Sequence, residues 1–253
     1  MIRSPIHRVL FTFRRHRVRA LLMGGQACVL YGAAEFTRDS DFLVSVDEAN
    51  LARLRAALTE LEARRVYVPD LDAGALLRGH ACHFRCGARG VEDWRIDLMA
   101  TLRGCAPFEE LWARHAEAQV PPGGRVATLA VADLVAAKKT QRDKDWPMIA
   151  RLVEADFIRA GKRPPPRQIE FWLMEARTSD LLLRLVRRFR GAAARIAPRR
   201  RAVAAALRSD LRSIDRALER EQRREREADR AYWKPLRDEL QRWRRTRARR
   251  THR

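Results

Sequence analysis

The stretch LLMGGQACVLYGAAEFTRDSDFLV, residues 21–44, decides the fold. An apolar run over residues 18–23 ends at Gly24 and Gly25, and this pattern predicts a strand that closes in a tight turn. A short helix is expected over residues 27–32. The stretch therefore begins with a strand, a glycine turn and a short helix.

A second strand is expected over residues 37–46, and two aspartates stand near its start. Residues i and i+2 of a strand point to the same face, so Asp39 and Asp41 lie side by side, while Phe42 and Val44 face the opposite way. Like charges at that distance repel each other unless a cation lies between them. Hard oxygen ligands of this kind suit Mg²⁺ or Mn²⁺. The alternative is an exposed loop in which both carboxylates are solvated.

A third aspartate lies inside an apolar strand. Residues 94–99 read WRIDLM, and Asp97 stands there between two large aliphatic residues. A buried carboxylate without a partner is expensive, so this position needs a cation. A metal ion shared with the first two aspartates would supply one, and so would an arginine such as Arg95 or Arg85.

The glycine pair is a candidate phosphate contact. Backbone amides at a helix N-terminus attract anions, and glycine lets phosphate oxygens approach the backbone closely. Gly24 and Gly25 stand after a predicted strand and before a predicted helix, where both effects apply. A Gly-Gly turn is a common feature by itself, so this signal gains its meaning only from the aspartates that follow.

Together these features resemble the nucleotidyltransferase superfamily, the DNA polymerase β-like group, and in particular its small bacterial toxin and abortive-infection members. The family pattern is an apolar strand, Gly-Gly or Gly-Ser, a short helix, Asp-X-Asp entering a strand, and a third Asp on a later strand. Residues 21–44 and 94–99 carry it here, and the resemblance extends over about residues 16–155. It implies an α+β fold in which flanking helices cover a small mixed β-sheet.

The resemblance implies that the three aspartates are catalytic and bind metal. Asp39 and Asp41 would hold the Mg²⁺ or Mn²⁺ ion that carries a nucleoside triphosphate, and Asp97 would join them at a second ion that activates the acceptor hydroxyl. Asp97 could also take the acceptor proton itself. Gly24, Gly25 and neighbouring cations would neutralise the phosphates as pyrophosphate leaves.

Further nucleotide contacts follow from the same resemblance. Small members often carry Gly-X-X-Arg-X-Thr-X-Asp-X-Asp; here Thr37 matches, Glu35 replaces the arginine, and Arg38 lies close enough to substitute for it. A helical region over residues 131–153, with a turn near Lys144, contains cations that could reach the triphosphate. The alternative for each of these cations is an ordinary surface pair on a helix. They are Lys138, Lys139 and Arg142.

The charge of the chain is strongly positive and unevenly distributed. Its 253 residues carry a net charge of +21, and 48 of the 53 basic residues are arginine. Residues 1–150 hold 22 basic and 18 acidic side chains, whereas residues 151–253 hold 31 and 14. A basic C-terminal region favours a polyanionic partner, most often nucleic acid. The alternative is a set of solvated arginines on exposed helix faces.

Three consecutive prolines, residues 164–166, predict a domain boundary, because such a run cannot continue a helix. We expect a nucleotidyltransferase-like domain over residues 1–163 and a basic, all-helical region over residues 167–253. Ser179 is a candidate helix N-cap in that region, and Gly191 a helix stop.

An apolar stripe in the C-terminal region predicts a helix that buries one face against the body or against a second copy of the chain. The segment 219–231, rich in arginine and glutamate, is expected to be a solvated helix, and Pro235 to begin a last short one. The stripe consists of Val203, Leu207, Leu211, Ile214 and Leu218.

Four cysteines are too few for a disulfide scaffold, so reduced thiols in a cytoplasmic protein are expected. The segment 80–86, HACHFRC, has soft ligands that invite a zinc site, but its spacing matches no common zinc motif. In a strand, Cys82, Phe84 and Cys86 face one side and His83 the other. We therefore expect buried structural cysteines.

No stretch reaches about 18 consecutive apolar residues, so no membrane-spanning helix is expected. Arg14 and Arg15 precede an apolar run, as in a twin-arginine export signal. Gly24, Gly25 and Gln26 interrupt that run, however, and a charged segment follows directly. We therefore do not expect export.

Two functional hypotheses remain open. In the first, the chain is a metal-dependent nucleotidyltransferase that moves a nucleoside monophosphate to an acceptor hydroxyl, and its basic helical region grips an RNA acceptor. In the second, the fold is a degenerate scaffold in a non-catalytic nucleic-acid-binding or assembly protein. Retention of the glycine pair and of all three aspartates favours the enzyme. The sequence leaves open the nucleotide, the acceptor (an RNA, a protein hydroxyl or a small molecule), homo-oligomerisation and an antitoxin partner.

Overall fold

A computed structural model describes residues 5–34, 37, 39–120 and 124–251, with side chains up to residue 246. The chain divides into two compact units, of which the first contains the β-sheet and the second is helical. Unit 1 comprises Met1–Leu30, Glu35–Leu134 and Tyr232–Arg253, and unit 2 comprises Tyr31–Ala34 and Val135–Ala231.

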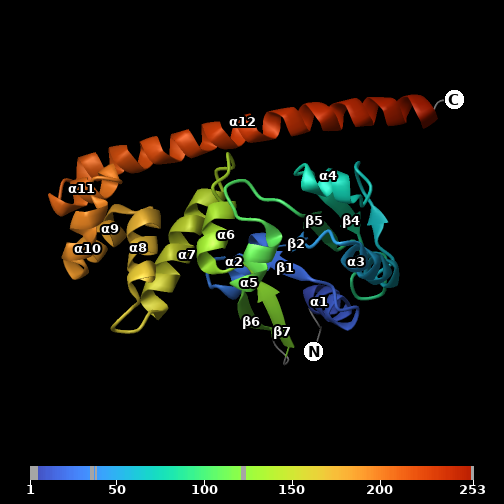
Figure 1. Cartoon of the computed structure of the whole chain (residues 1–253), viewed down its shortest axis with the longest axis horizontal. Helices are drawn as coiled ribbons and strands as arrows, with labels where there is room; N and C mark the ends of the chain where they lie inside the picture. Colours follow the sequence, from blue (N-terminus) through green and yellow to red (C-terminus); the bar gives the residue numbers. More distant parts are fainter. Residues whose placement is uncertain (1–4, 35–36, 38, 121–123, 252–253) are drawn as a thin grey trace. The chain divides into compact units, whose positions relative to one another are not determined.

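Among the described residues, seven strands of unit 1 form one mixed sheet (Figure 1). Their order across the sheet is β3-β4-β5-β2-β1-β7-β6. β2 runs parallel to β5 and β1 parallel to β7, whereas the other neighbours are antiparallel. The expected α+β class with a mixed sheet is therefore confirmed. The strands are β1 (Ala20–Met23), β2 (Asp39–Val44), β3 (Arg64–Arg65), β4 (Cys82–Arg85), β5 (Arg95–Met99), β6 (Ala116–Val120) and β7 (Gly124–Thr128).

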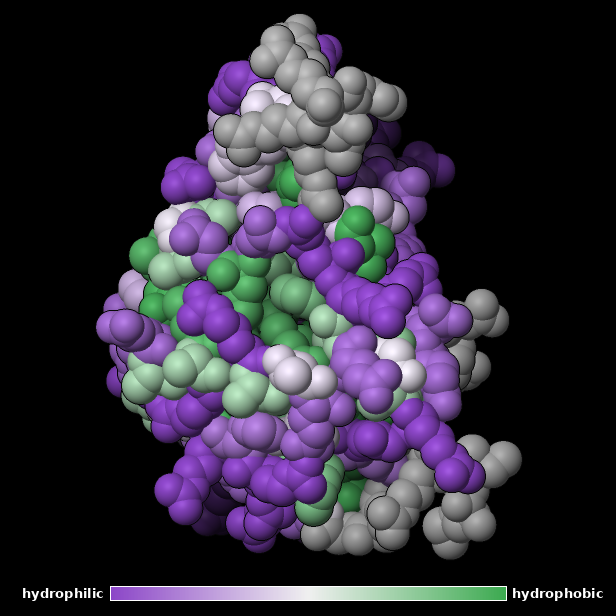
Figure 2. Space-filling model, turned by 90° about the vertical axis from the view of Figure 1, so that its right-hand side faces the viewer, coloured by the Kyte–Doolittle hydropathy of each residue, from purple (hydrophilic) through white to green (hydrophobic). Residues whose placement is uncertain are grey.

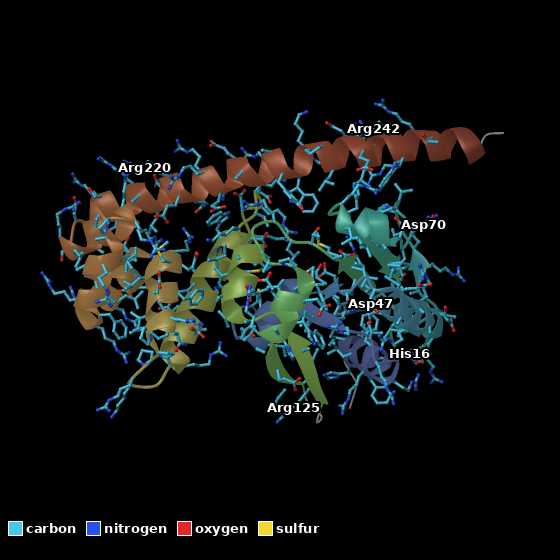
Figure 3. All side chains as sticks on the ribbon, viewed as in Figure 1. His16, Asp47, Asp70, Arg125, Arg220 and Arg242 are labelled. Atoms are coloured by element: carbon cyan, nitrogen blue, oxygen red, sulfur yellow. The ribbon has the colours of Figure 1, made fainter. Side chains whose placement is uncertain are left out.

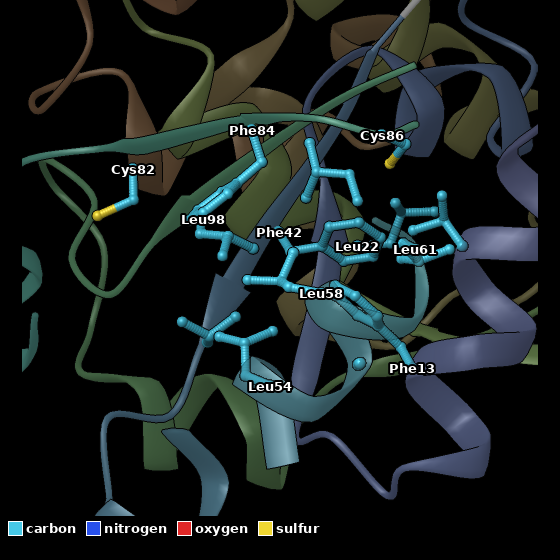
Figure 4. Close-up of a cluster of buried hydrophobic side chains, with 14 of the residues drawn as sticks. Phe13, Leu22, Phe42, Leu54, Leu58, Leu61, Cys82, Phe84, Cys86 and Leu98 are labelled. Carbon is cyan, nitrogen blue, oxygen red and sulfur yellow. The ribbon is translucent and has the colours of Figure 1, made fainter. Parts of the chain in front are cut away.

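The main core of unit 1 lies on one face of this sheet (Figure 4). Phe42 and Val44 of β2 point into it, as the alternation in the sequence predicted, and Phe13 packs on Phe42 with the ring centroids 4.8 Å apart. Leu54 and Leu58, from the apolar face of helix α3, also belong to this core. Burial of these side chains holds this face of the sheet against its helices. The helices of unit 1 are α1 (Pro5–Arg15), α2 (Gly24–Leu30), α3 (Glu48–Glu60), α4 (Ala73–Leu77) and α5 (Phe108–Ala113), and α6 (Val131–Ala137) leads into unit 2.

Several local predictions in unit 1 need correction. Strand β6 was missed, because its sequence AEAQV has few of the β-branched residues that favour strands, and it forms only by pairing with β7. The N-cap of α3 is Asp47, whose carboxylate accepts a hydrogen bond from Asn50 N at 2.8 Å. Asn50 is also a residue type that caps helices. Its buried side chain instead binds the backbone of Arg19 and Ser45.

Unit 2 is a set of packed helices. α7 and α8 lie in it together although the three prolines separate them, so the units differ in extent from the two predicted domains. Thr178, not Ser179, caps α9, because its hydroxyl accepts a hydrogen bond from Leu181 N at 3.3 Å. Gly191 lies in the first turn of α10 instead of ending a helix. The helices are α7 (Asp145–Arg159), α8 (Pro166–Glu175), α9 (Ser179–Arg188), α10 (Arg190–Ile196), α11 (Arg201–Leu207) and the first part of α12 (Leu211–Thr251).

The predicted apolar stripe belongs to two helices, not one. The chain turns between α11 and α12, where Ser209 has a φ of 55°. Ile214 and Leu218 are buried as expected, but Leu207 is half-buried and Leu211 is 53% exposed. The turn rotates the second helix, so the spacing of the stripe does not continue through it.

Helix α12 also passes through Pro235, which was expected to begin a new helix. A proline removes one backbone N–H, and here burial of the next residue, Leu236, offsets the loss. The segment 219–231 is helical and mostly solvated, but some of its side chains contact the rest of unit 2. Asp229 is buried and accepts a hydrogen bond from Gln141 N at 2.9 Å, and Glu221 pairs with two arginines of unit 2.

No helix over the described residues carries an apolar run long enough to cross a membrane.

Candidate active site

Asp39, Asp41 and Asp97 lie together on the face of the sheet that faces away from the main core. β2 and β5 are parallel and in register, so Asp41 stands beside Asp97 and Asp39 beside Arg95. Neighbouring residues in register share a face of the sheet, which turns the i,i+2 spacing into a three-residue cluster. Each aspartate offers a carboxylate oxygen, and these three atoms all lie within 4.8 Å of one another.

The glycine pair allows the backbone to approach this cluster. Gly24 begins α2 with a φ of +66°, and a Cβ there would come within 1.8 Å of Asp41 Oδ2. A Cβ on Gly25 would come within 2.8 Å of Thr37 Oγ1. Thr37 Oγ1 in turn donates a hydrogen bond to Asp39 Oδ1 at 2.5 Å. The glycines therefore have a steric reason to be present, and their predicted contact with phosphate stays a prediction.

Asp97 has two partners, His83 on the neighbouring strand β4 and Arg95 on its own strand β5. His83 Nδ1 lies 2.8 Å and Arg95 Nε 2.7 Å from Asp97 Oδ1. Burial alone would raise the pKa of Asp97, but the hydrogen bonds from His83 and Arg95 outweigh it and hold the pKa below its usual value. The alternative of an arginine partner for this carboxylate is therefore present in Arg95, and the shared metal ion stays a prediction. Arg85, the other candidate, donates to the backbone of Asp93 at 3.3 Å.

His83 is a site residue that the sequence reasoning did not place at the aspartates. The available signal was the strand alternation, because antiparallel pairing of β4 and β5 sets His83 directly opposite Asp97. Cys82 and Cys86 are buried on the core side, as predicted, and burial raises the pKa of each thiol to about 11. Within the described ranges, the aspartate cluster is the group of three or more His, Cys, Asp or Glu side chains that could hold a metal ion. Cys82 and Cys86 do not belong to it.

The predicted phosphate-binding cations of the helical region lie in unit 2 and bind carboxylates there. Lys138 Nζ is 3.2 Å and Arg142 Nε 2.8 Å from the carboxylate of the fully buried Asp145. Lys139 Nζ is 2.7 Å from Glu175. Their role as nucleotide contacts stays a prediction. Glu35 and Arg38, which the family pattern singled out, lie outside the described residues.

The residues of the aspartate cluster fit a divalent cation. Mg²⁺ binds oxygen at about 2.1 Å, so two ligands on opposite sides of one ion lie about 4.2 Å apart. Three carboxylate oxygens within 4.8 Å of one another match that scale with small side-chain adjustments. Hard, anionic oxygen donors are also the ligands that Mg²⁺ and Mn²⁺ prefer. Asp39, Asp41 and Asp97 could therefore hold such an ion.

Comparisons with known proteins add little to this geometry. No protein-family model and no curated protein matches the chain. Among solved structures, the chain is similar to the solution structure of the antibiotic-resistance factor ANT(2'')-Ia. The match has 13% identity, covers 78% of this chain and 95% of that chain, and has a TM-score of 0.34. A likeness at that level does not establish a shared function, so the functional case depends on the site itself.

Proposed function

We propose that the chain is a metal-dependent nucleotidyltransferase that moves a nucleoside monophosphate from a nucleoside triphosphate to an acceptor hydroxyl. The observation that carries this proposal is the convergence of Asp39, Asp41 and Asp97 within 4.8 Å beside a glycine turn. Two carboxylates on one strand and a third on its parallel neighbour gather negative charge that a divalent cation would neutralise. Mg²⁺ or Mn²⁺ is the expected ion.

In this reaction the acceptor oxygen attacks the α-phosphorus. A new P–O bond forms there, the bond from the α-phosphorus to the oxygen that bridges to the β-phosphate breaks, and pyrophosphate leaves with that oxygen. The acceptor proton passes to a carboxylate or to water. A bound divalent ion would supply charge neutralisation at the phosphates and lower the pKa of the acceptor hydroxyl.

The partners of Asp97 support one role for it within the proposal. His83 and Arg95 hold this carboxylate in its ionised form, so it is a ready metal ligand across the expected pH range. The same interactions make it a weak proton acceptor, because a lowered pKa means a weak base. We therefore favour metal binding over proton transfer for Asp97. The hydrogen bond from Thr37 Oγ1 would hold the carboxylate of Asp39 in a fixed orientation.

The nucleotide contacts are a separate part of the proposal. Gly24, Gly25, Thr37 and Arg38 are expected near the phosphates because the family pattern places these residues around the aspartates. Lys138, Lys139 and Arg142 belong to this part only if they exchange their carboxylate partners for phosphate. That exchange is testable, because it requires nucleotide to alter the environment of these three side chains in unit 2.

The proposal is tested by transfer of label. The purified chain is offered each α-labelled nucleoside triphosphate with Mg²⁺ or Mn²⁺ and total cellular RNA. Asp39→Asn and Asp41→Asn should each lower incorporation by about 10³-fold or more, since the removed charge is a metal ligand. Asp47→Asn is the matched control: Asp47 is an exposed carboxylate of the same unit that caps α3, and asparagine also caps helices.

The outcomes separate the two hypotheses left open by the sequence. Label that disappears in both variants and stays in the control supports the enzyme. A wild-type chain that neither transfers label nor binds any nucleotide with Mn²⁺ present would show a non-catalytic scaffold instead. Incorporation that survives Asp41→Asn would place the activity at another site or in a contaminant.

A further inference from the structure

The end of helix α12 that belongs to unit 1 has two distinct faces. One face packs on the body of the unit: Leu236 is buried, Glu239 Oε2 lies 2.8 Å from His80 Nε2, and the ring of Trp243 lies 4.6 Å from that of His80. His80 is itself buried. These interactions anchor the segment 232–246 and determine which of its side chains point outward.

The other face of the segment 232–246 is basic. Its exposed cations include Arg242, labelled in Figure 3, and the exposed Asp238 lies 3.4 Å from Lys234. In Figure 2, which shows this side of the molecule, hydrophilic residues surround a hydrophobic area. By contrast, the segment 211–231 of the same helix alternates seven basic with six acidic residues. The exposed cations of the basic face are Lys234, Arg237, Arg242, Arg244 and Arg245.

An exposed tyrosine connects this basic face to the aspartates. Tyr67 is 49% exposed, and the guanidinium carbon of Arg244 lies 6.0 Å from the centre of its ring. The rings of Tyr67 and His83 also meet edge to face at 5.7 Å, and His83 Nδ1 lies 2.8 Å from Asp97 Oδ1. A hydrogen bond from Val66 N to His83 O, 2.8 Å long, holds the backbone next to this tyrosine.

We propose that Tyr67 and the basic face of segment 232–246 bind the end of a single-stranded nucleic acid as the acceptor of the transfer. This inference rests on the proposed function. Exposed aromatic rings beside arginines stack unpaired bases, while the arginines bind phosphates. A duplex offers no unstacked base to Tyr67. An acidic protein would bind through the arginines alone, so it would not explain the exposed ring. The path from Tyr67 through His83 to Asp97 then leads the last nucleotide toward the carboxylates.

A nucleic-acid strand supplies the hydroxyl that this transfer reaction requires. A terminal ribose hydroxyl of the strand attacks the α-phosphorus, a phosphodiester bond forms, and the bond to pyrophosphate breaks. The hydroxyl proton passes to a carboxylate or to water, and no oxidant or further reactant is needed. Each turnover lengthens the strand by one nucleotide.

Binding is measured first, without nucleoside triphosphate, by fluorescence anisotropy of a labelled oligonucleotide of about 12 nucleotides. Separate arms use RNA, DNA of the same sequence, and the RNA duplex. Tyr67→Ala should weaken single-strand binding by at least about fivefold, since it removes the stacking of one base, and Tyr67→Phe should retain it. Heparin and polyglutamate serve as competitors without bases.

The arginines are tested by the salt dependence of binding. In Arg244→Gln/Arg245→Gln the plot of log K against log salt should become shallower by about 0.7 for each phosphate that the protein no longer neutralises. The matched control is Arg223→Gln/Arg224→Gln, two exposed consecutive arginines on the same helix in its segment of mixed charge. This control should keep nearly the full slope. Circular dichroism and Mn²⁺ binding verify that each variant is folded.

The transfer assay then distinguishes this inference from the proposed function. Extension of the free single strand but not of a strand with a blocked terminal hydroxyl, lowered by at least about fivefold in Tyr67→Ala, supports both. Transfer of label to a protein or a small molecule, with no effect of Tyr67→Ala, overturns this inference and leaves the nucleotidyltransferase standing. Tyr67-dependent strand binding without any transfer by wild type overturns the strand as acceptor together with the proposed function. Equal binding of duplex, single strand and polyglutamate would also overturn the inference.

Discussion

Two buried aspartates, Asp97 in unit 1 and Asp145 in unit 2, differ in how their carboxylate oxygens are hydrogen-bonded. Burial would raise the pKa of both, and hydrogen bonds and nearby cations lower it in both. Asp145 is bound at both oxygens, by Lys138 at Oδ1 and by Thr140 and Arg142 at Oδ2. Asp97 receives its two partners at one oxygen and shares its surroundings with two further carboxylates.

The difference separates a structural carboxylate from a functional one. At Asp145 two cations and a hydroxyl serve a single carboxylate, so the cluster is balanced by its own side chains. At Asp97 three carboxylates converge, an arrangement that gains stability from an added cation. Perturbed pKa values occur at both places, so the pKa direction alone does not identify a site. The convergence of three carboxylates at Asp97 is what distinguishes the two places.

The largest difference should appear in stability. Asp145→Ala should lower the free energy of unfolding by about 3–5 kcal/mol, because it leaves the buried Lys138 uncompensated. Asp41→Asn should leave stability unchanged or slightly higher, because it relieves repulsion among carboxylates. Urea denaturation followed by circular dichroism compares the two variants. Equal losses in both would mean that the aspartate cluster is also a structural ion-pair site.

Addition of metal should sharpen the comparison. Mn²⁺ at about 100 times its dissociation constant should stabilise the wild-type chain by about 2.7 kcal/mol, since only the folded cluster binds it. The gain should vanish in Asp39→Asn and Asp41→Asn and persist in Asp145→Asn. Thermal unfolding with and without Mn²⁺ measures it, and a chelator reverses it. Persistence of the gain in Asp41→Asn would move the metal site elsewhere.

The glycine turn gives an intermediate effect. Gly24→Ala and Gly104→Ala both place a Cβ at positive φ, +66° and +74°, at about 1–2 kcal/mol each. The Gly24 substitution meets Asp41 Oδ2, whereas none of the described atoms lies within 4 Å of the Cβ added at Gly104. Displacement of a metal-binding carboxylate should lower transfer by about 10²-fold in Gly24→Ala alone. Similar activity in the two variants would show that the close approach to Asp41 is dispensable.

Acid should give the smallest effect. The pKa of Asp145 is lowered in the folded chain, so its contribution to stability is present above its ordinary pKa and is lost as the pH falls through the folded value. Below about pH 4 this one group should change the unfolding free energy by at most about 1.4 kcal/mol per pH unit. Asp145→Asn should remove that part of the slope. An unchanged slope in the variant would assign the acid dependence to other carboxylates.

Much of the site was predictable because its signals are local. The i,i+2 spacing of Asp39 and Asp41 and the position of Asp97 in an apolar strand depend only on the two-residue period of a strand. The core face of β2 followed from the same alternation. The hairpin strand β6 and the cap at Asp47 were not predictable in this way, because β6 forms only with its partner strand and two neighbouring polar residues competed for the cap.

The sequence by itself determined which faces of the strands are apolar, which positions carry carboxylates, and that a glycine turn precedes them, because these are properties of residues close together in the chain. Only the tertiary structure decided that β2 and β5 are parallel and in register, which brings Asp97 beside the distant Asp41. It also placed His83 on Asp97, and Arg244 over Tyr67. Interactions between distant segments depend on how strands pair and helices pack, and a pattern of neighbouring residues does not contain that information.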